Sequence, residues 1–497
     1  MLLSAAIFAM LGAAAAAQEA PAVSSAAVQR QAAGIKVTRD KDLVSVDNFP
    51  SEALGNLRTL RILLPPGYDG SGEAYPVVYM HDRQNLFSKK TAAHGMEWEA
   101  DETAGRLIGG KKTRPFIIVG IDNTPARVSE YTQTRDEKSG EGGAAEEYAR
   151  FLEREVVPYV DGLYRTIPRR QGRAVMGSSL GGLVSLYILA TRPQTFSMAG
   201  VMSPSLWWGQ RSIFGLVERS TIPADAKIWL DMGMRESSEE TVPDAIDMER
   251  LLQARGLRYG ENLLFMLDGP AAHNEAAWAR RLHNPLQWFF GPAAGEVVEA
   301  RGVVSEDKLA LNGEPASARF WGRLRFSSGI SCDYIPDAVA ASPPLLSWKD
   351  AKLSVVSGAE PRAVKLTGRF GSRPFSAALR IVKYLSPWTD LALTVALPKG
   401  TPAGAEIYIA GSQDELGGWD PGKIKLSPVP GKPLERVFRA RFRRGAAVSF
   451  KFTRGSWKTV EKDRDGGEVP DHTLVFGEAA MTARVRVARW ADAAAAK

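Results

Sequence analysis

The sequence predicts an α/β protein with a doubly wound, mostly parallel sheet, followed by a β-rich segment and a C-terminal β-sandwich. Three observations lead to this prediction. Between residues 36 and 291, short apolar runs alternate with helical segments, which is the pattern of a parallel sheet covered by helices on both faces. After residue 291, short alternating runs broken by Gly, Ser and Pro replace the helices. From residue 390 to 490 such runs recur at the spacing of a sandwich of about 100 residues.

The α/β part is expected to hold its strands in the continuously apolar runs Leu60–Leu64, Val77–Met80, Phe116–Ile121, Ala174–Gly177, Met198–Met202, Ile228–Met232 and Leu263–Leu267. Apolar residues at helical spacing predict a helix over Ala144–Tyr164, which Pro158 should kink. Further helices are expected at Leu180–Ala190, Asp244–Ala254 and Glu275–Phe290. The expected strands of the sandwich are Leu391–Leu397, Glu406–Ala410, Val437–Phe442, Val448–Thr453 and Thr482–Ala488.

The length of 497 residues suggests two or three domains at roughly 100–200 residues each. We expect a signal peptide over 1–17, a linker over 18–35, the α/β domain over 36–291, a small β-rich segment or ordered linker over 292–388 and the sandwich over 389–490. The apolar stretch Met1–Ala17 ends in an A-x-A-like site and is too short for a membrane span. It predicts a secreted or periplasmic protein, although no Lys or Arg precedes it; an alanine-rich tail is the alternative.

Charge and cysteine content narrow the possible partners. The formal net charge of +7 is small for this length, and the basic residues near the C-terminus alternate with apolar ones as on the solvated face of strands. We therefore expect no nucleic-acid or membrane partner. The sequence shows no zinc spacing, P-loop or dinucleotide motif, so we expect no metal and no cofactor. Cys332 is the only cysteine, which excludes an intrachain disulfide, and it is interpreted as a structural thiol.

The most informative segment is Gly177-Ser-Ser-Leu-Gly181, which lies between a predicted strand and a predicted helix. In that context a G-x-S-x-G pattern forms a sharp turn that exposes the serine hydroxyl, here Ser179. Side chains two residues either side of the serine would clash in so tight a turn. The positive end of the following helix favours negative charge that develops beside Ser179.

A serine nucleophile needs a base, and the base needs an acid that orients it. His273 lies in a loop after the strand Leu263–Leu267, where the chain order Ser, acid, His places the base. Between Ser179 and His273, the segment 227–236 offers Glu236 in a loop and Asp231 within a strand. Glu236 is preferred because a loop residue can reach the imidazole; Asp231 is the alternative, and an ordinary surface carboxylate is the non-functional one.

The oxyanion of an acyl-transfer intermediate needs two backbone N–H donors. Leu180, directly after the nucleophile, is expected to supply one. Gln84, in the loop His81–Phe87 after the strand Val77–Met80, is expected to supply the other. Arg127, Trp207 and Trp208 are further candidates for the cleft; the alternatives are pairing of Arg127 with Glu130 or Asp122, and packing of the tryptophans, which is favoured.

The α/β part resembles the Putative esterase family of α/β-hydrolases, which includes enterochelin esterases, the esterase D group, feruloyl and acetylxylan esterases and mycolyltransferases. The resemblance covers about 36–291 and rests on motifs in order: Leu64-Pro-Pro-Gly-Tyr68, His81-Asp-Arg-Gln-Asn-Leu-Phe87, Val119-Gly-Ile-Asp-Asn123 with Arg127 and Glu130-Tyr131, Gly177-Ser-Ser-Leu-Gly-Gly182, Ser203-Pro-Ser-Leu-Trp-Trp208, and His273 with Trp278. It implies ester hydrolysis through an acyl-enzyme on Ser179, with His273 as base. Arg83 stands where the family commonly has Gly, so its side chain could crowd the oxyanion loop or contact substrate.

Residues 390–477 resemble a starch-binding module of the glucoamylase type, carbohydrate-binding family 20. The matching motifs are Ile407-Tyr-Ile-Ala-Gly411, Glu415-Leu-Gly-Gly-Trp-Asp-Pro421 and Phe450-Lys-Phe-Thr-Arg-Gly-Ser-Trp457 with Glu461. By motif position, the resemblance implies that Trp419, Lys451 and Trp457 bind carbohydrate. The alternative is a sandwich spacer whose tryptophans are core.

Together these observations predict a secreted or periplasmic serine esterase acting on an acylated carbohydrate or a similar acyl ester, such as an acyl-siderophore. Its partners would be the ester substrate and a polysaccharide such as a glucan. Two alternatives stay open: a glycan-binding protein with a dormant hydrolase domain, and an acyltransferase that uses the same residues.

Overall fold

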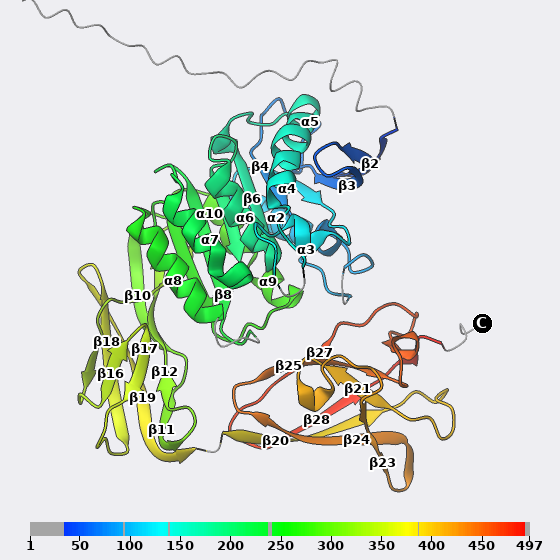
Figure 1. Ribbon diagram of the computed structural model, residues 1–497, viewed down its shortest axis with the longest axis vertical. Helices are drawn as coiled ribbons and strands as arrows, with labels where there is room; N and C mark the ends of the chain where they lie inside the picture. Colours follow the sequence, from blue (N-terminus) through cyan, green and yellow to red (C-terminus); the bar gives the residue numbers. More distant parts are fainter. Residues whose placement is uncertain (1–33, 93–94, 138–139, 237–240, 386, 493–497) are drawn as a thin grey trace, which may run out of the picture.

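A computed structural model describes residues 34–492 apart from 93–94, 138–139, 237–240 and 386. The expected signal peptide lies outside the described residues. The fold class is as predicted: a large α/β part is followed by a β-rich part and a C-terminal β-sandwich (Figure 1). No helix of the described chain has the length and apolar character needed to cross a membrane.

The α/β part is built on a nine-stranded sheet of order β1-β2-β3-β5-β4-β6-β7-β8-β9. Neighbouring strands are parallel along the run β5-β4-β6-β7-β8-β9. The pairs β1-β2, β2-β3 and β3-β5 are antiparallel. The strands are β1 (Lys36–Asp40), β2 (Leu43–Ser51), β3 (Asn56–Leu63), β4 (Val77–Met80), β5 (Ile117–Ile121), β6 (Arg173–Ser178), β7 (Met198–Met202), β8 (Lys227–Gly233) and β9 (Leu263–Asp268). Strands β1 and β2 were not expected from the sequence.

Helices cover both faces of this sheet, because its strands are apolar on both sides. Val77 and Tyr79 of β4 enter one core, and Val78 and Met80 enter the other. The first core is completed by α4 (Ala145–Phe151), α5 (Val157–Leu163), α6 (Leu180–Thr191), α7 (Trp208–Arg219) and α8 (Thr241–Ala254). The second is completed by α2 (Ala100–Gly109), α9 (Glu275–Arg281) and α10 (His283–Phe290).

Two of the predicted helices differ in detail. The segment predicted as Ala144–Tyr164 is interrupted by a π-helical turn, Leu152–Val156, which ends two residues before Pro158. Since proline has no N–H to donate to the preceding turn, the irregularity falls where the kink was expected. The segment predicted as Glu275–Phe290 is two helices, α9 and α10, that meet at Leu282. Helices α2 and α7 were not predicted.

The segment 292–388 is a folded β structure rather than a linker. Its strands are β10 (Val297–Val304), β11 (Lys308–Gly313), β12 (Ser317–Ala318), β13 (Phe320–Phe326), β14 (Ser331–Tyr334), β15 (Ala340–Ser342), β16 (Leu346–Lys349), β17 (Lys352–Val355), β18 (Arg362–Phe370) and β19 (Arg373–Leu385). They enclose a separate apolar core that includes Phe320, Leu366 and Ile381. Cys332 on β14 is buried, and burial raises the pKa of its thiol.

This middle segment covers the outer edge of β9, the last strand of the large sheet. Asp333 Oδ2 accepts the Leu267 N–H at 2.8 Å, and Arg323 Nη2 donates to the Leu267 carbonyl at 3.0 Å. Arg323 and Asp333 also pair with each other at 2.8 Å. The edge groups of β9 at Leu267 are therefore satisfied by side chains instead of by a further strand.

The C-terminal part is a sandwich of two four-stranded sheets, ordered β23-β24-β20-β28 and β22-β21-β25-β27. Their strands are β20 (Trp388–Ala396), β21 (Tyr408–Gly411), β22 (Ile424–Lys425), β23 (Ser427–Val429), β24 (Lys432–Arg443), β25 (Ala447–Thr453), β27 (His472–Val475) and β28 (Met481–Arg486). A small pair, β26 (Glu461–Lys462) and β29 (Arg489–Trp490), adjoins them. Leu393, Ile409, Phe442 and Phe452 lie in the core between the sheets.

Candidate active site

Ser179 lies in a sharp turn between β6 and α6. Its backbone has φ 59° and ψ −124°, which a non-glycine residue adopts only when the surrounding structure imposes it. Its N–H donates to the carbonyl of Met202 at the end of β7, 3.0 Å away. The side chain is half-buried at the carboxyl end of the parallel strands. This is the strand–turn–helix context that the sequence predicted.

Neighbouring glycines allow this turn to approach other backbone segments. A Cβ on Gly177 would lie 2.9 Å from both the Gly181 carbonyl carbon and His81 Cδ2. A Cβ on Gly182 would lie 2.7 Å from the Met202 oxygen. At Gly181 the nearest atom is 3.4 Å away, which is a looser fit. The predicted clash is thus confirmed at Gly177, and Gly182 adds a requirement that the motif pattern does not include.

His273 and Glu236 form a hydrogen-bonded pair. The Nδ1 atom of His273 lies 2.7 Å from Glu236 Oε2. The Glu236 side chain is 1 % exposed, whereas that of His273 is 35 % exposed and borders the cavity described below. Burial would raise the pKa of Glu236, but the hydrogen bond and charge of His273, with the hydrogen bond from Ser203, hold it below the ordinary value. An ionised Glu236 can therefore fix the imidazole with Nδ1 protonated.

Ser203 holds Glu236 from the opposite side. It lies after the end of β7, its φ is 39°, and its Oγ donates to Glu236 Oε1 at 2.6 Å. The same oxygen accepts from Trp278 Nε1 at 3.0 Å and from Arg281 Nη2 at 2.7 Å. Its single proton and both lone pairs are used, so the orientation of the hydroxyl is fixed. Sequence reasoning placed Ser203 only within a family motif and assigned it no role.

Asp231, the alternative acid, is engaged elsewhere. It is completely buried on β8, and its carboxylate accepts from Arg281 Nη2 at 2.9 Å and from Trp229 Nε1 at 2.7 Å. Burial raises the pKa of Asp231, and the charge of Arg281 opposes that shift. Because the oxygen atoms face these donors, the structure places Glu236 rather than Asp231 on His273.

Ser179 and His273 border one cavity of about 580 Å³, within the usual size of small-molecule sites. Within the described part of the chain no hydrogen bond joins the two residues; Ser179 Oγ lies 3.4 Å from Ser205 Oγ. Catalytic hydrogen bonds are often long before substrate binds. The two side chains thus face one space without being in direct contact.

The two predicted oxyanion donors lie in first helical turns. Leu180 begins α6, and Gln84 lies in a short 3₁₀ helix, Arg83–Asn85, after β4. First-turn N–H groups have no acceptor within their helix. The Gln84 side chain is held to Asn123 by hydrogen bonds of 2.9, 3.0 and 3.1 Å. Asp82 and Asn85 from this loop line the cavity, whereas neither Gln84 nor Leu180 does.

Arg83, the departure from the family pattern, turns away from the cavity. It forms an ion pair with Asp122, and its Cγ packs against Gly120 of β5, where a Cβ would lie 2.5 Å away. It is not among the residues that line the cavity. The expected crowding of the oxyanion loop is therefore wrong, because a glycine on the neighbouring strand makes room for the side chain.

Arg127 lines the cavity and pairs with Asp82, at 2.7 and 2.8 Å, instead of with Glu130 or Asp122. Burial would raise the pKa of Asp82, but Arg127 and Asn123 hold it below the ordinary value. Trp208 is buried, as the packing interpretation predicted, and donates to the Thr134 carbonyl at 2.8 Å. Trp207 is 46 % exposed, so that interpretation is wrong for it.

Trp419 and Trp457, two of the three predicted carbohydrate-binding residues, lie close together. The rings of Trp419 and Trp457 are 6.4 Å apart and inclined by 38°. Lys451 is buried, and its ammonium donates to the Val469 carbonyl and lies 3.6 Å from Asp471. Trp419 also lines the cavity that holds Ser179, which sequence reasoning did not anticipate. Among the described residues, no three His, Cys, Asp or Glu side chains are grouped as a metal site requires.

Comparisons with known proteins agree with this architecture. Residues 51–289 match the family described as "Putative esterase", and residues 390–469 match "Starch binding domain". The chain is 31 % identical over 250 residues to an endo-1,4-beta-xylanase/feruloyl esterase of Xylanibacter ruminicola, covering 49 % of this chain and 30 % of that protein. It is 41 % identical over 160 residues to a siderophore enterobactin esterase of Emericella nidulans, covering 29 % and 51 %. Both matches thus span about half or less of the relative's length.

Among solved structures, a BES protein from Bacillus cereus is similar to 52 % of this chain and 98 % of its own, at 19 % identity and a TM-score of 0.41.

Proposed function

We propose that the protein is a serine carboxylic-ester hydrolase that acts on an acylated carbohydrate through an acyl-enzyme, because residues 51–289 match the Putative esterase family and residues 390–469 match the starch-binding domain. The observation that carries the proposal is the shared cavity: Ser179 in its strained turn and the His273–Glu236 pair border the same space.

In the first half of the reaction, Ser179 Oγ attacks the ester carbonyl carbon while its proton passes to His273 Nε2. Glu236 accepts the Nδ1–H of the imidazole and stabilises the imidazolium that forms. The carbonyl oxygen becomes an oxyanion, for which the N–H groups of Leu180 and Gln84 are the proposed donors. The intermediate collapses with cleavage of the bond to the alcohol oxygen, which takes the proton from His273.

In the second half, water replaces the alcohol. His273 removes a proton from the water while the water oxygen attacks the acyl carbon. Collapse of the second intermediate breaks the bond to Ser179 Oγ, which regains its proton from His273 Nε2. The products are a carboxylic acid and an alcohol, and the enzyme returns to its starting state.

An acylated carbohydrate is favoured as substrate because an esterase segment and a starch-binding segment occur in one chain. A relative named as a feruloyl esterase supports this class, while a relative named as a siderophore esterase supports an acyl-siderophore as a competitor. Export is part of the proposal and rests on the apolar segment Met1–Ala17.

The test is hydrolysis of p-nitrophenyl acetate and butyrate by the full chain, beside Ser179→Ala and His273→Ala. We expect both variants to lose about a thousandfold or more of kcat. His283→Ala is the matched control, because this histidine begins α10, contacts the Arg280 carbonyl and does not line the cavity. Wild-type turnover no faster than that of Ser179→Ala would overturn the proposal for simple esters.

A further inference from the structure

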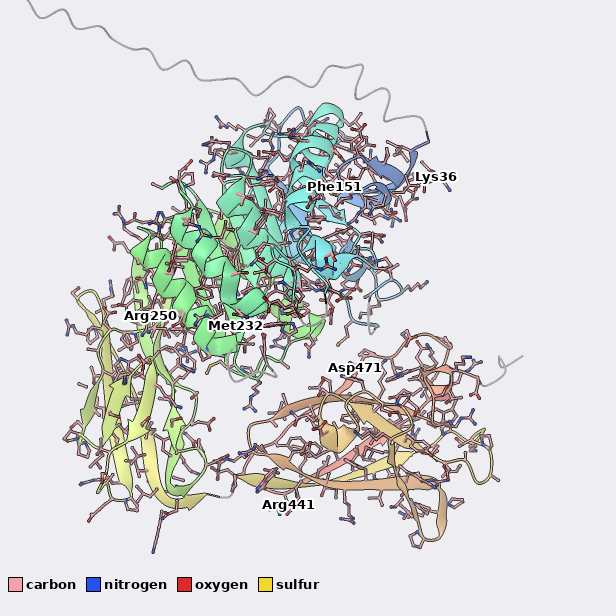
Figure 2. All side chains as sticks on the ribbon, viewed as in Figure 1. Lys36, Phe151, Met232, Arg250, Arg441 and Asp471 are labelled. Atoms are coloured by element: carbon pink, nitrogen blue, oxygen red, sulfur yellow. The ribbon has the colours of Figure 1, made fainter. Side chains whose placement is uncertain are left out.

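The cavity beside Ser179 is built by two parts of the chain that are far apart in sequence. The α/β part supplies Ser179, His273 and their neighbours, and the C-terminal sandwich supplies Ser412, Trp419, Ala447, Ser449 and Asp471. Figure 2 shows Asp471 on the side of the sandwich that faces the α/β part. The sandwich thus closes one side of the candidate active site instead of lying apart from it.

Direct contacts hold the sandwich in this position. Arg235, next to Glu236, donates from Nη1 to the Gly445 carbonyl at 2.6 Å and itself lines the cavity. A second contact joins Gly95 of the α/β part to Glu468 of the sandwich, where a Cβ added to Gly95 would lie only 3.1 Å from Glu468 Cβ. Arg443 of the sandwich also pairs with Glu314 of the middle segment. Contacts with both preceding parts of the chain therefore fix the sandwich over the cavity.

Trp419 is the aromatic residue that the sandwich contributes to this cavity. Trp419 follows Gly417 and Gly418, and its φ is 64°. Its N–H donates to the Gly411 carbonyl at 2.8 Å, which fixes the backbone. A tryptophan in the left-handed backbone conformation is strained, and strained residues are frequent at ligand-binding and active sites. An indole beside polar side chains suits a sugar ring, which has an apolar C–H face and hydroxyl groups at its rim.

The charges around the cavity also favour a neutral polyol. The lining contains the guanidinium groups of Arg127 and Arg235 and the carboxylates of Asp82, Glu275 and Asp471. Arg127 is paired with Asp82, and Asp471 lies near the buried Lys451. This balance lacks the excess of positive charge that a polyanionic siderophore would require.

From these observations we infer that the substrate is an acylated glucoside bound across both parts of the chain, with a sugar ring against Trp419 and the ester carbonyl at Ser179. The inference rests on the proposed esterase function and names its substrate class. Trp419 then determines specificity for the alcohol side of the ester, and the sandwich acts within the active site rather than as a remote anchor on starch.

The first test compares kcat/KM for acetylated maltoheptaose with kcat/KM for p-nitrophenyl acetate, which has no sugar. In Trp419→Ala, the ratio of the two should fall about tenfold or more, because the stacking surface is lost. Leu434→Ala is the control: Leu434 is an exposed apolar residue of the same sandwich, on β24, and it does not line the cavity. It should keep the wild-type ratio. An unchanged ratio in Trp419→Ala overturns the inference.

A second test is independent of turnover. In a Ser179→Ala background, calorimetry should show acetylated maltoheptaose binding about fivefold or more tighter than plain maltoheptaose, because the acyl group enters the cavity beside the sugar. Adding Trp419→Ala should remove this preference. Equal affinities for the two sugars would overturn the inference even if the enzyme is active. Loss of wild-type hydrolysis with the preference intact would instead overturn the proposed function alone.

Discussion

The Ser203 hydroxyl donates a 2.6 Å hydrogen bond to Glu236 Oε1, while the other oxygen of that carboxylate faces His273. The Gly233 N–H also donates to Oε1, at 2.8 Å. One carboxylate oxygen is thus fixed by the ends of two adjacent strands, β7 and β8, and the other is left for the imidazole. The position of His273 therefore depends on a hydroxyl that does not line the cavity.

Ser203→Ala should lower kcat about tenfold with little change in KM, because Glu236 loses one of its two supports and His273 loses its fixed orientation. The free energy of unfolding should also fall by about 1–3 kcal/mol, since the N–H donors of Trp278 and Arg281 lose an acceptor. Steady-state kinetics and urea unfolding measure the two effects. An unchanged kcat under conditions where the variant is folded would contradict the positioning role.

Glu236→Gln should lower kcat about a thousandfold or more while the protein stays folded. The amide can donate to Nδ1 and hold the imidazole in the wrong tautomer, and it cannot stabilise the imidazolium. Asp231→Asn is the comparison, because this residue pairs with the buried Arg281 instead of His273. Its main effect should be a loss of unfolding free energy. A larger loss of kcat in Asp231→Asn than in Glu236→Gln would reverse the assignment of the acid.

Glu249→Gln should stabilise the protein at alkaline pH. Glu249 is buried on α8 and accepts from the Tyr259 hydroxyl at 2.8 Å, and burial raises its pKa to about 7. The folded state thus binds a proton that the unfolded state has lost above pH 4.5. The wild-type protein therefore loses stability from this group as the pH rises from there to about 7.

The variant carries no such penalty, so its advantage should be near zero at pH 4 and reach at most about 3 kcal/mol at pH 8. Urea unfolding at the two pH values measures it. An advantage that is equal at both would show that Glu249 does not titrate in this range.

Gly177→Ala should destabilise the fold by about 1–3 kcal/mol, because the added methyl group would meet His81 and the backbone of Gly181 at 2.9 Å. Gly105→Ala is the matched control within α2, where nothing lies within 4 Å of the added atom. It should stabilise by about 0.5–1 kcal/mol, since alanine favours the helix. Thermal unfolding of both variants checks the opposite signs.

The parallel strands and the turn at Ser179 could be predicted because their signals are local: continuous apolar runs for buried strands, and small residues where the chain approaches itself. Strands β1 and β2 were missed because they lie at the outer edge of the sheet, where exposed polar positions interrupt the apolar pattern. The middle segment was underestimated because its short strands come from several small sheets.

The site shows the same division. His273 and Glu236 could be predicted because both lie in loops that follow strands of one parallel sheet, whose carboxyl ends meet at one edge. The chain order after the nucleophile indicated His273, and the loop position favoured Glu236. The partners of Arg127 and Arg83 could not be predicted, since they depend on which neighbouring loop presents a carboxylate. The position of Trp419 on the cavity that Ser179 also borders depends on how the middle segment and the sandwich pack, and no local pattern specifies that packing.

The covered edge of β9 has a consequence for engineering. This strand leads directly into the loop that carries His273, and its edge groups at Leu267 are satisfied by Arg323 and Asp333 from the middle segment. A chain cut after Gly291 would leave those groups exposed, as a template for pairing with another molecule. The α/β part is therefore poorly suited to transfer into other proteins on its own. Removing the middle segment and the sandwich should favour self-association and destabilise β9, the strand that precedes the loop with His273.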